Sequence, residues 1–286
     1  MSNNANGFMG CTSSYEEAKI VIYGAPFDNT TSYRPGTRFG SSAIRSESFG
    51  IEDYSVYQDL SLSDFKIHDA FDIELPFGDT KKALYMIEEM SRSVVGDSKI
   101  PVLLGGEHLV SYAAIKPLVE KYQDLVIVHF DAHADLRDDY LGQKLSHATV
   151  MRRIWEITGD DRIYQFGIRS GEKSEFEFAD KHTNMYKFDL DSVKDVKEKL
   201  KGKHVYLSLD LDVLDPAFFS GTGTPEPAGV SFKELLNAVL ELKGLEVVGC
   251  DIVELSPHYD HSGASTAAAC KITREILIMI GGNCNE

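Results

Sequence analysis

The sequence predicts an α/β protein built as a single three-layer α/β/α domain around a mostly parallel sheet of about eight strands. Short apolar runs recur along the whole chain, helical patterns lie between many of them, and no linker or internal repeat interrupts the series. Strands that alternate with helices in this way are typical of a parallel sheet covered on both faces. We therefore expect residues 1–286 to form one domain, in which residues 1–15 are a flexible N-terminal segment.

Eight runs rich in Val, Ile, Leu, Tyr and Phe are the predicted strands, and several of them show no alternation of polar and apolar residues. A strand buried on both faces has this continuous pattern, because helices cover the sheet from each side. In chain order the runs are residues 20–23, 65–67, 100–104, 125–130, 163–166, 185–188, 205–209 and 246–252.

Three helices are predicted by apolar spacing together with end signals. Residues 80–95 repeat apolar side chains at helical spacing, and Gly96 follows as a stop signal. Ser231 and Glu234 have the spacing of a capping box, which predicts the start of a second helix. Residues 267–280 carry isoleucines four positions apart and predict a third helix near the C-terminus.

The charge balance and the cysteines exclude several classes of protein. With 29 Lys and Arg against 45 Asp and Glu, the net charge is −16, which disfavours nucleic acid and anionic membranes because phosphates would not be neutralised. No apolar stretch approaches the roughly 18 residues that span a bilayer, the N-terminus lacks the features of a signal peptide, and the four cysteines have no C-x-x-C spacing. We expect a cytoplasmic protein with a small cationic substrate and with neither nucleic acid nor membrane as a partner.

Residues that bind metals gather where three of the predicted strands end. Ligands in an open parallel sheet bind beyond the carboxyl ends of the strands, so the three clusters can converge on one crevice. Residues i and i+2 leave a strand end on the same side, so both members of a D-x-H or D-x-D pair can face one centre. The clusters follow the runs at 100–104, 125–130 and 205–209 and contain His108; Asp131, His133 and Asp135; and Asp210 and Asp212.

Four carboxylates and two imidazoles are too many ligands for one tetrahedral site, and they suit two adjacent ions that share bridging carboxylates. Four negative charges also balance two divalent cations. Oxygen and imidazole ligands without thiolates favour Mn²⁺, with Fe²⁺, Co²⁺ and Zn²⁺ as alternatives. A single Asp at a strand end is more often a helix cap, so the prediction depends on finding all three clusters together.

The segments GGEH, DAHADLR and SLDLDVLDPAFFSGTGTPEPAG together resemble the ureohydrolase family, which comprises arginases, agmatinases and their relatives. The resemblance extends through residues 24–45, 166–171 and 251–263 and so covers nearly the whole chain. It implies an arginase-like fold, a trimer or hexamer of identical subunits, and two Mn²⁺ ions per subunit. In this resemblance one ion is bound by His108 and Asp135, the other by His133 and Asp212, and both by Asp131 and Asp210.

The resemblance also implies roles in binding and catalysis for three side chains. Glu254 matches the glutamate that binds the guanidinium group, and His147 matches a mobile histidine that shuttles protons. Asp135 would relay a proton from the attacking water to the leaving nitrogen. The implied reaction is hydrolysis of a guanidinium group, in which paired cations lower the pKa of the attacking water.

Within this family the chain most resembles agmatinases, which implies the conversion of agmatine to putrescine and urea in polyamine biosynthesis. Residues 136–153 carry Asp138 and Asp139 where arginases have an Asn- and Ser-bearing segment that contacts the substrate's amino acid end. Acidic side chains near the mouth of a site favour a substrate with a distal ammonium group. Guanidinobutyrase and arginase activities remain alternatives, as does a non-catalytic binding protein on the same scaffold. A two-metal phosphoesterase is disfavoured, since its G-N-H-[DE] and G-H-x-H segments are absent.

Overall fold

A computed structural model describes residues 7–283 of the chain. Its main sheet has eight strands, and all neighbouring strands in it are parallel. In spatial order they are β4 (Ile67–Asp72), β1 (Ile20–Ala25), β5 (Ile100–Gly105), β10 (Glu246–Val253), β9 (His204–Asp210), β6 (Val126–Phe130), β7 (Ile163–Ile168) and β8 (Asn184–Lys187). Each corresponds to one of the eight predicted runs, so the predicted sheet is confirmed.

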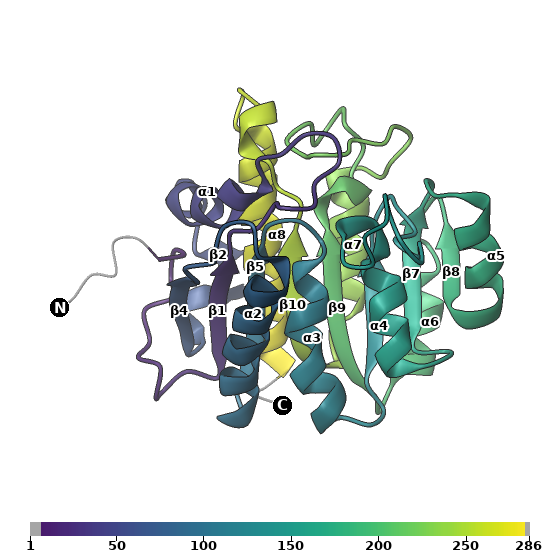
Figure 1. Cartoon of the computed structure of the whole chain (residues 1–286). Coiled ribbons are helices and arrows are strands. Elements are labelled where there is room, and N and C mark those ends of the chain that lie inside the picture. Colours follow the sequence, from purple (N-terminus) through teal and green to yellow (C-terminus); the bar gives the residue numbers. More distant parts are fainter. Residues whose placement is uncertain (1–6, 284–286) are drawn as a thin grey trace.

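Helices cover both faces of the sheet and complete three layers (Figure 1). One layer consists of α2 (Thr80–Gly96), α3 (Val110–Lys121), α4 (Val150–Thr158) and α5 (Lys173–His182). The other consists of α1 (Gly40–Glu47), α6 (Val193–Leu200), α7 (Phe232–Glu241) and α8 (Ala264–Asn283). The three predicted helices are α2, α7 and α8, and the capping box of α7 forms as expected between Ser231 and Glu234. The α/β/α fold class is therefore confirmed.

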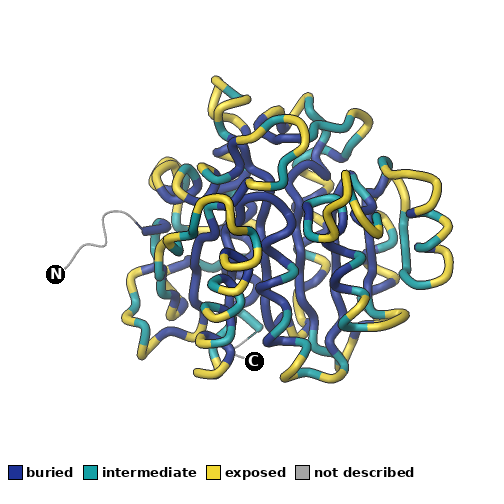
Figure 2. Tube along the Cα trace, in the orientation of Figure 1, coloured by how far each residue is buried: buried dark blue, intermediate teal, exposed yellow. Residues whose placement is uncertain are grey.

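The strands are buried along their length while the outer faces of the helices are exposed (Figure 2). This explains why the central strands read as continuous apolar runs. The edge strand β4 is the exception: it was predicted over residues 65–67 but runs over Ile67–Asp72. Its polar residues His68 and Asp69 concealed it, and Asp69 is tolerated because Arg45 pairs with it in the interior. The chain also forms a short hairpin, β2 (Tyr54–Ser55) and β3 (Leu60–Ser61), that was not predicted.

Part of the segment that was predicted to be flexible, residues 1–15, packs against the rest of the protein. Phe8 and Cys11 are only 2% and 1% exposed, and the backbone N–H of Phe8 donates to Asp69 Oδ2 at 2.7 Å. Thr12 forms an isolated bridge with His68 of β4. Two buried side chains and these backbone bonds fix a segment whose polar composition suggested a tail. The remainder of the predicted tail, residues 1–6, lies outside the described residues.

The carboxyl ends of three strands carry long connections, residues 26–36 after β1, 131–146 after β6 and 214–230 after β9. The connections after β1 and β9 lie at the same end of the molecule, the upper end in Figure 1. Long connections at this edge frame a crevice beyond the strand ends. Among the helices within residues 7–283, none has the length and apolar character that crossing a bilayer requires.

Replacing Arg45 with Met is expected to lower the free energy of unfolding by about 3–5 kcal/mol, because it leaves a buried carboxylate unpaired. Arg45 is 4% exposed, and its Nε lies 2.8 Å from Asp69 Oδ2. Denaturant unfolding measures the loss. Arg92→Met is the matched control, since the Arg92 side chain is 40% exposed and its surface ion pairs are worth about 1 kcal/mol or less. Equal losses for the two variants would contradict this account of the N-terminal packing.

Candidate metal centre

The predicted metal ligands come together at the centre of the sheet. They follow β5, β9 and β6, and Glu254 follows β10, so the four supporting strands are consecutive neighbours in the sheet. Of the predicted ligands only His133 has a partly exposed side chain, at 24%, and the others are buried. The parallel register therefore brings residues more than 100 positions apart in the sequence into one cluster.

His108 Nδ1 faces three carboxylates at once. It lies 3.1 Å from Asp131 Oδ2, 3.3 Å from Asp135 Oδ2 and 3.2 Å from Asp210 Oδ2, yet it makes no hydrogen bond with correct geometry. Ligand atoms that surround a cation octahedrally at about 2.1 Å are themselves about 3 Å apart along each edge of the octahedron. The three carboxylate oxygens therefore lie as far from His108 Nδ1 as neighbouring ligands of one cation would lie, and the residues present fit a metal ion.

A second group of ligand atoms surrounds His133. Its Nδ1 lies 3.0 Å from Asp212 Oδ2 and 3.4 Å from Asp131 Oδ1. Asp131 thus directs one carboxylate oxygen to each histidine, which is the arrangement of a carboxylate between two ions. Asp210 is less symmetric: Oδ2 faces His108, whereas Oδ1 accepts the backbone N–H of Asp212 at 2.8 Å.

A chain of hydrogen bonds inside the sheet orients His108. Its Nε2 lies 2.9 Å from Ser208 Oγ, and the Ser208 hydroxyl donates to Asp251 Oδ1 at 2.9 Å. Because the Ser208 proton is used toward Asp251, Ser208 Oγ accepts from His108, and Nε2 is the nitrogen that donates. The lone pair of Nδ1 then points at the carboxylates. Histidine ligands are commonly oriented in this way by a hydrogen bond at their other nitrogen. Ser208 and Asp251 were not predicted, although each is a polar residue within an apolar strand.

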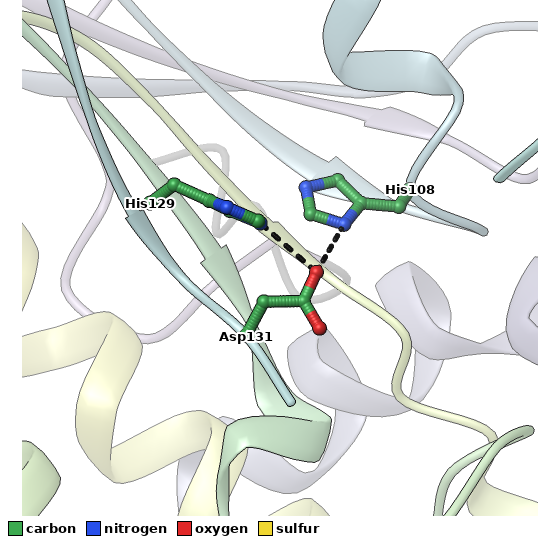
Figure 3. Close-up of side chains that lie close together, drawn as sticks. All are labelled: His108, His129 and Asp131. Atoms are coloured by element: carbon green, nitrogen blue, oxygen red, sulfur yellow. Dashed lines mark hydrogen bonds and ion pairs between the residues drawn. The ribbon is translucent and has the colours of Figure 1, made fainter. Parts of the chain in front are cut away.

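His129 also approaches the cluster, as Figure 3 shows, but it has the geometry of a supporting residue. Gln165 Nε2 donates to His129 Nδ1 at 3.2 Å and to the carbonyl of Ala134 at 2.9 Å. His129 Nε2 then carries the proton and donates to Asp131 Oδ2 at 2.9 Å. Burial lowers the pKa of His129, which keeps the ring neutral. His129 therefore orients Asp131 and has no lone pair to offer a cation.

The electrostatics of the cluster favour cations. Burial raises the pKa of Asp210 well above its usual range, and the charges of Asp212 and Asp131 raise it further. Burial and the neighbouring Asp131 raise the pKa of Asp135 to about 7, and burial also raises the pKa of Glu254 strongly. Loss of water and mutual repulsion both oppose the ionisation of carboxylates held this close together. A nearby positive charge reduces the cost of each. Divalent cations are the counter-charges that this donor set binds best.

A cavity of about 220 Å³ lies over the cluster, smaller than pockets that hold drug-sized ligands. Asp135, Asp210 and Asp212 line it together with Glu254 and His147. His133 also lines the cavity, and His108 contacts Asp131, Asp135 and Asp210 directly. All eight predicted site residues are therefore brought together.

Glu254 and Asp135 both adopt left-handed backbone conformations, with φ of 67° and 53°. This region is costly for most residues other than glycine, and such conformations are frequent at functional sites. Glu254 Oε1 accepts the backbone N–H of His108 at 2.8 Å. Within residues 7–283 its other oxygen accepts no hydrogen bond, which leaves that oxygen available to a ligand in the cavity.

His147 opens the short 3₁₀ turn His147–Thr149, and its Nε2 lies 3.2 Å from Ser32 Oγ. Burial lowers the pKa of His147 to about 4, so its ring is neutral at pH 7 and can accept a proton. The acidic pair Asp138 and Asp139 does not line the cavity. Asp138 pairs with Arg153 at 2.9 Å, and Asp139 accepts the N–H of Gly142 in a turn. The expectation that this pair faces a substrate ammonium is wrong.

Fold and site together define an α/β protein with a candidate two-cation centre at the carboxyl edge of a parallel sheet. A sequence model of the arginase family matches residues 18–279, and the chain belongs to this family. It is 49% identical over 269 residues to the agmatinase of Bacillus cereus, covering 93% of each protein. It is likewise 49% identical over 276 residues to the agmatinase of Bacillus subtilis, covering 95% of each. The crystal structure of agmatine ureohydrolase from Thermoplasma volcanium superposes with a TM-score of 0.88 at 33% identity, over 96% of this chain and 94% of that one.

Removing the hydroxyl that orients His108 should weaken metal binding. Ser208→Ala is expected to lower Mn²⁺ affinity about 10- to 100-fold, because the imidazole loses the partner that fixes its protonated nitrogen. Equilibrium dialysis of the purified protein measures the affinity directly. Ser91→Ala is the matched control, since Ser91 is an equally buried serine whose hydroxyl bonds to the carbonyl of Ala114, away from the site. An unchanged affinity in Ser208→Ala would remove Ser208 from the centre.

Proposed function

We propose that this protein hydrolyses agmatine to putrescine and urea at a centre that holds two Mn²⁺ ions. The observation that carries the proposal is the convergence of carboxylate and imidazole ligands beneath a small cavity whose wall contains Glu254. Agmatinases that are about half identical to the chain over nearly its whole length support the choice of substrate. The six residues that would hold the ions are His108, Asp131, His133, Asp135, Asp210 and Asp212.

Water and guanidinium are both unreactive at neutral pH, and the proposed site addresses the two problems with different groups. Two divalent cations would lower the pKa of a water molecule from about 16 towards roughly 7 and so supply the nucleophile. Manganese is the proposed metal because the ligands are oxygen and imidazole with no thiolate. The remaining chemistry belongs to side chains that line the cavity.

Glu254 would bind the guanidinium group by charge-assisted hydrogen bonds. One oxygen of its carboxylate accepts the N–H of His108, and Glu254 lines the cavity, so the other oxygen would contact the ligand. A cation held in this orientation is presented to the nucleophile at the inner end of the cavity, which converts a random encounter into a positioned one.

Asp135 and His147 would move the protons. Asp135 both contacts His108 and lines the cavity, so it can pass a proton from the attacking water to the leaving nitrogen. His147 lies in the cavity wall and would exchange protons with the departing amine and with solvent.

The substrate is tested by measuring urea after Mn²⁺-loaded protein is incubated separately with agmatine, arginine and guanidinobutyrate. Agmatine should be turned over with the highest kcat/KM. A preference for arginine or guanidinobutyrate would contradict the proposed substrate, and the absence of urea from all three would contradict the proposed reaction.

The role of Glu254 is tested by Glu254→Gln, which preserves the acceptor for His108 but removes the charge that attracts guanidinium. We expect Mn²⁺ stoichiometry to stay unchanged while kcat/KM for agmatine falls at least about 100-fold, as expected for one lost charge-assisted contact in a buried site. Glu275→Gln serves as the control, because Glu275 is a fully buried carboxylate of α8 that does not line the cavity. Loss of metal in Glu254→Gln would instead identify Glu254 as a ligand.

A further inference from the structure

The loop after β1 contacts His147 at two points. The hydroxyl oxygen of Thr30 accepts the backbone N–H of His147 at 3.1 Å, and Ser32 Oγ lies 3.2 Å from His147 Nε2. The other ring nitrogen of His147, Nδ1, is buried and has no hydrogen-bond partner. Within residues 7–283, this loop therefore provides the hydrogen bonds that locate both the main chain and the ring of His147.

Glu107 holds this loop in place. Its carboxylate receives the Thr30 N–H at 3.1 and 3.2 Å, the Thr30 hydroxyl at 2.6 Å and the Thr31 hydroxyl at 3.0 Å. Its own N–H donates to the carbonyl of Phe27 at 2.8 Å. Glu107 precedes His108 and is 1% exposed, yet it does not line the cavity. It is thus the residue of the GGEH segment that the proposed reaction leaves without a role.

The direction of donation in these hydrogen bonds links Glu107 to His147 through Thr30. A threonine hydroxyl has a single proton, and at Thr30 that proton is used in the short bond to the Glu107 carboxylate. The lone pairs of the same oxygen are then free to accept the N–H of His147. A hydrogen bond to an ionised acceptor polarises the hydroxyl and strengthens the bond that it accepts.

Burying a carboxylate in order to hold a loop carries a large desolvation cost. Glu107 is 1% exposed, so its carboxylate has lost almost all contact with water. An apolar contact would hold the loop at a lower cost in desolvation. The carboxylate does what an apolar side chain cannot do, since it directs the Thr30 hydroxyl and so defines the position of the His147 main chain.

We propose that Glu107 and Thr30 are positioning residues, which hold His147 at the cavity through the hydrogen-bond chain from the Glu107 carboxylate to the Thr30 hydroxyl to the His147 N–H. The proposal deepens the proposed function and rests on it where catalysis is concerned. The placement of His147 itself can be measured without any substrate.

Catalysis is tested with Thr30→Val, which keeps the shape of the side chain but removes the hydroxyl. We expect kcat for agmatine to fall about tenfold, the effect of one lost hydrogen bond in a buried site, with KM and Mn²⁺ stoichiometry unchanged. Thr30→Ser restores the hydroxyl and should restore kcat. In a His147→Ala background Thr30→Val should have no further effect, because both changes act through the same imidazole. Additive losses would overturn the proposal.

Hydrogen exchange provides the readout that needs no turnover. Thr30→Val should accelerate exchange of the His147 amide about tenfold, in keeping with the loss of its acceptor, and Thr30→Ser should match the wild type. Thr31→Val is the matched control: it also removes a hydroxyl bonded to Glu107, but Thr31 does not touch His147, so exchange and kcat should stay at wild-type values. Unchanged exchange in Thr30→Val would overturn the proposal. Wild-type protein that forms no urea from agmatine would overturn the proposed function alone.

Discussion

The structure depends on one electrostatic constraint, the burial of several carboxylates at the ends of neighbouring parallel strands. Asp131, Asp135, Asp210 and Asp212 lie within one cluster that is almost free of solvent. Burial opposes charge on the two imidazoles beside them, yet the adjoining carboxylates hold the pKa values of His108 and His133 well above their usual range. Such an arrangement is costly unless cations balance it. The geometry agrees with the electrostatics, because the atoms around His108 Nδ1 stand at the separations of ligands about one ion.

The sheet supplies the rigidity that this cluster requires. Hydrogen bonds from within the strands orient the ligands: Ser208 and Asp251 fix His108, while Gln165 and His129 fix Asp131. These supporting residues lie in β9, β10, β7 and β6, where the backbone is held on both sides by parallel neighbours. Loops supply the rest of the cavity wall, so the ligands sit on rigid elements and the groups that contact a substrate sit on more adaptable ones.

Much of the fold and the inner site could be predicted from the sequence because both leave local signals. Short apolar runs marked the strands, although the run for β4 reached only its first residue, and clusters such as Asp131, His133 and Asp135 directly followed them. The supporting hydrogen bonds could not be predicted, since the pairing of Ser208 with His108 or of Thr30 with Glu107 depends on strand order and loop path. The same limit applies to two further residues. Asp138 is acidic and adjacent to the site, but Arg153 holds it away from the cavity, and Phe8 is buried by a sheet edge far along the chain.

Anomalous diffraction from crystals of the Mn²⁺-loaded protein tests the central claim most directly. The account predicts two manganese peaks in each subunit, one about 2.2 Å from His108 Nδ1 and the other at a similar distance from His133 Nδ1, with the Asp131 carboxylate between them. A single peak, peaks at other residues, or no manganese at this edge of the sheet would contradict it.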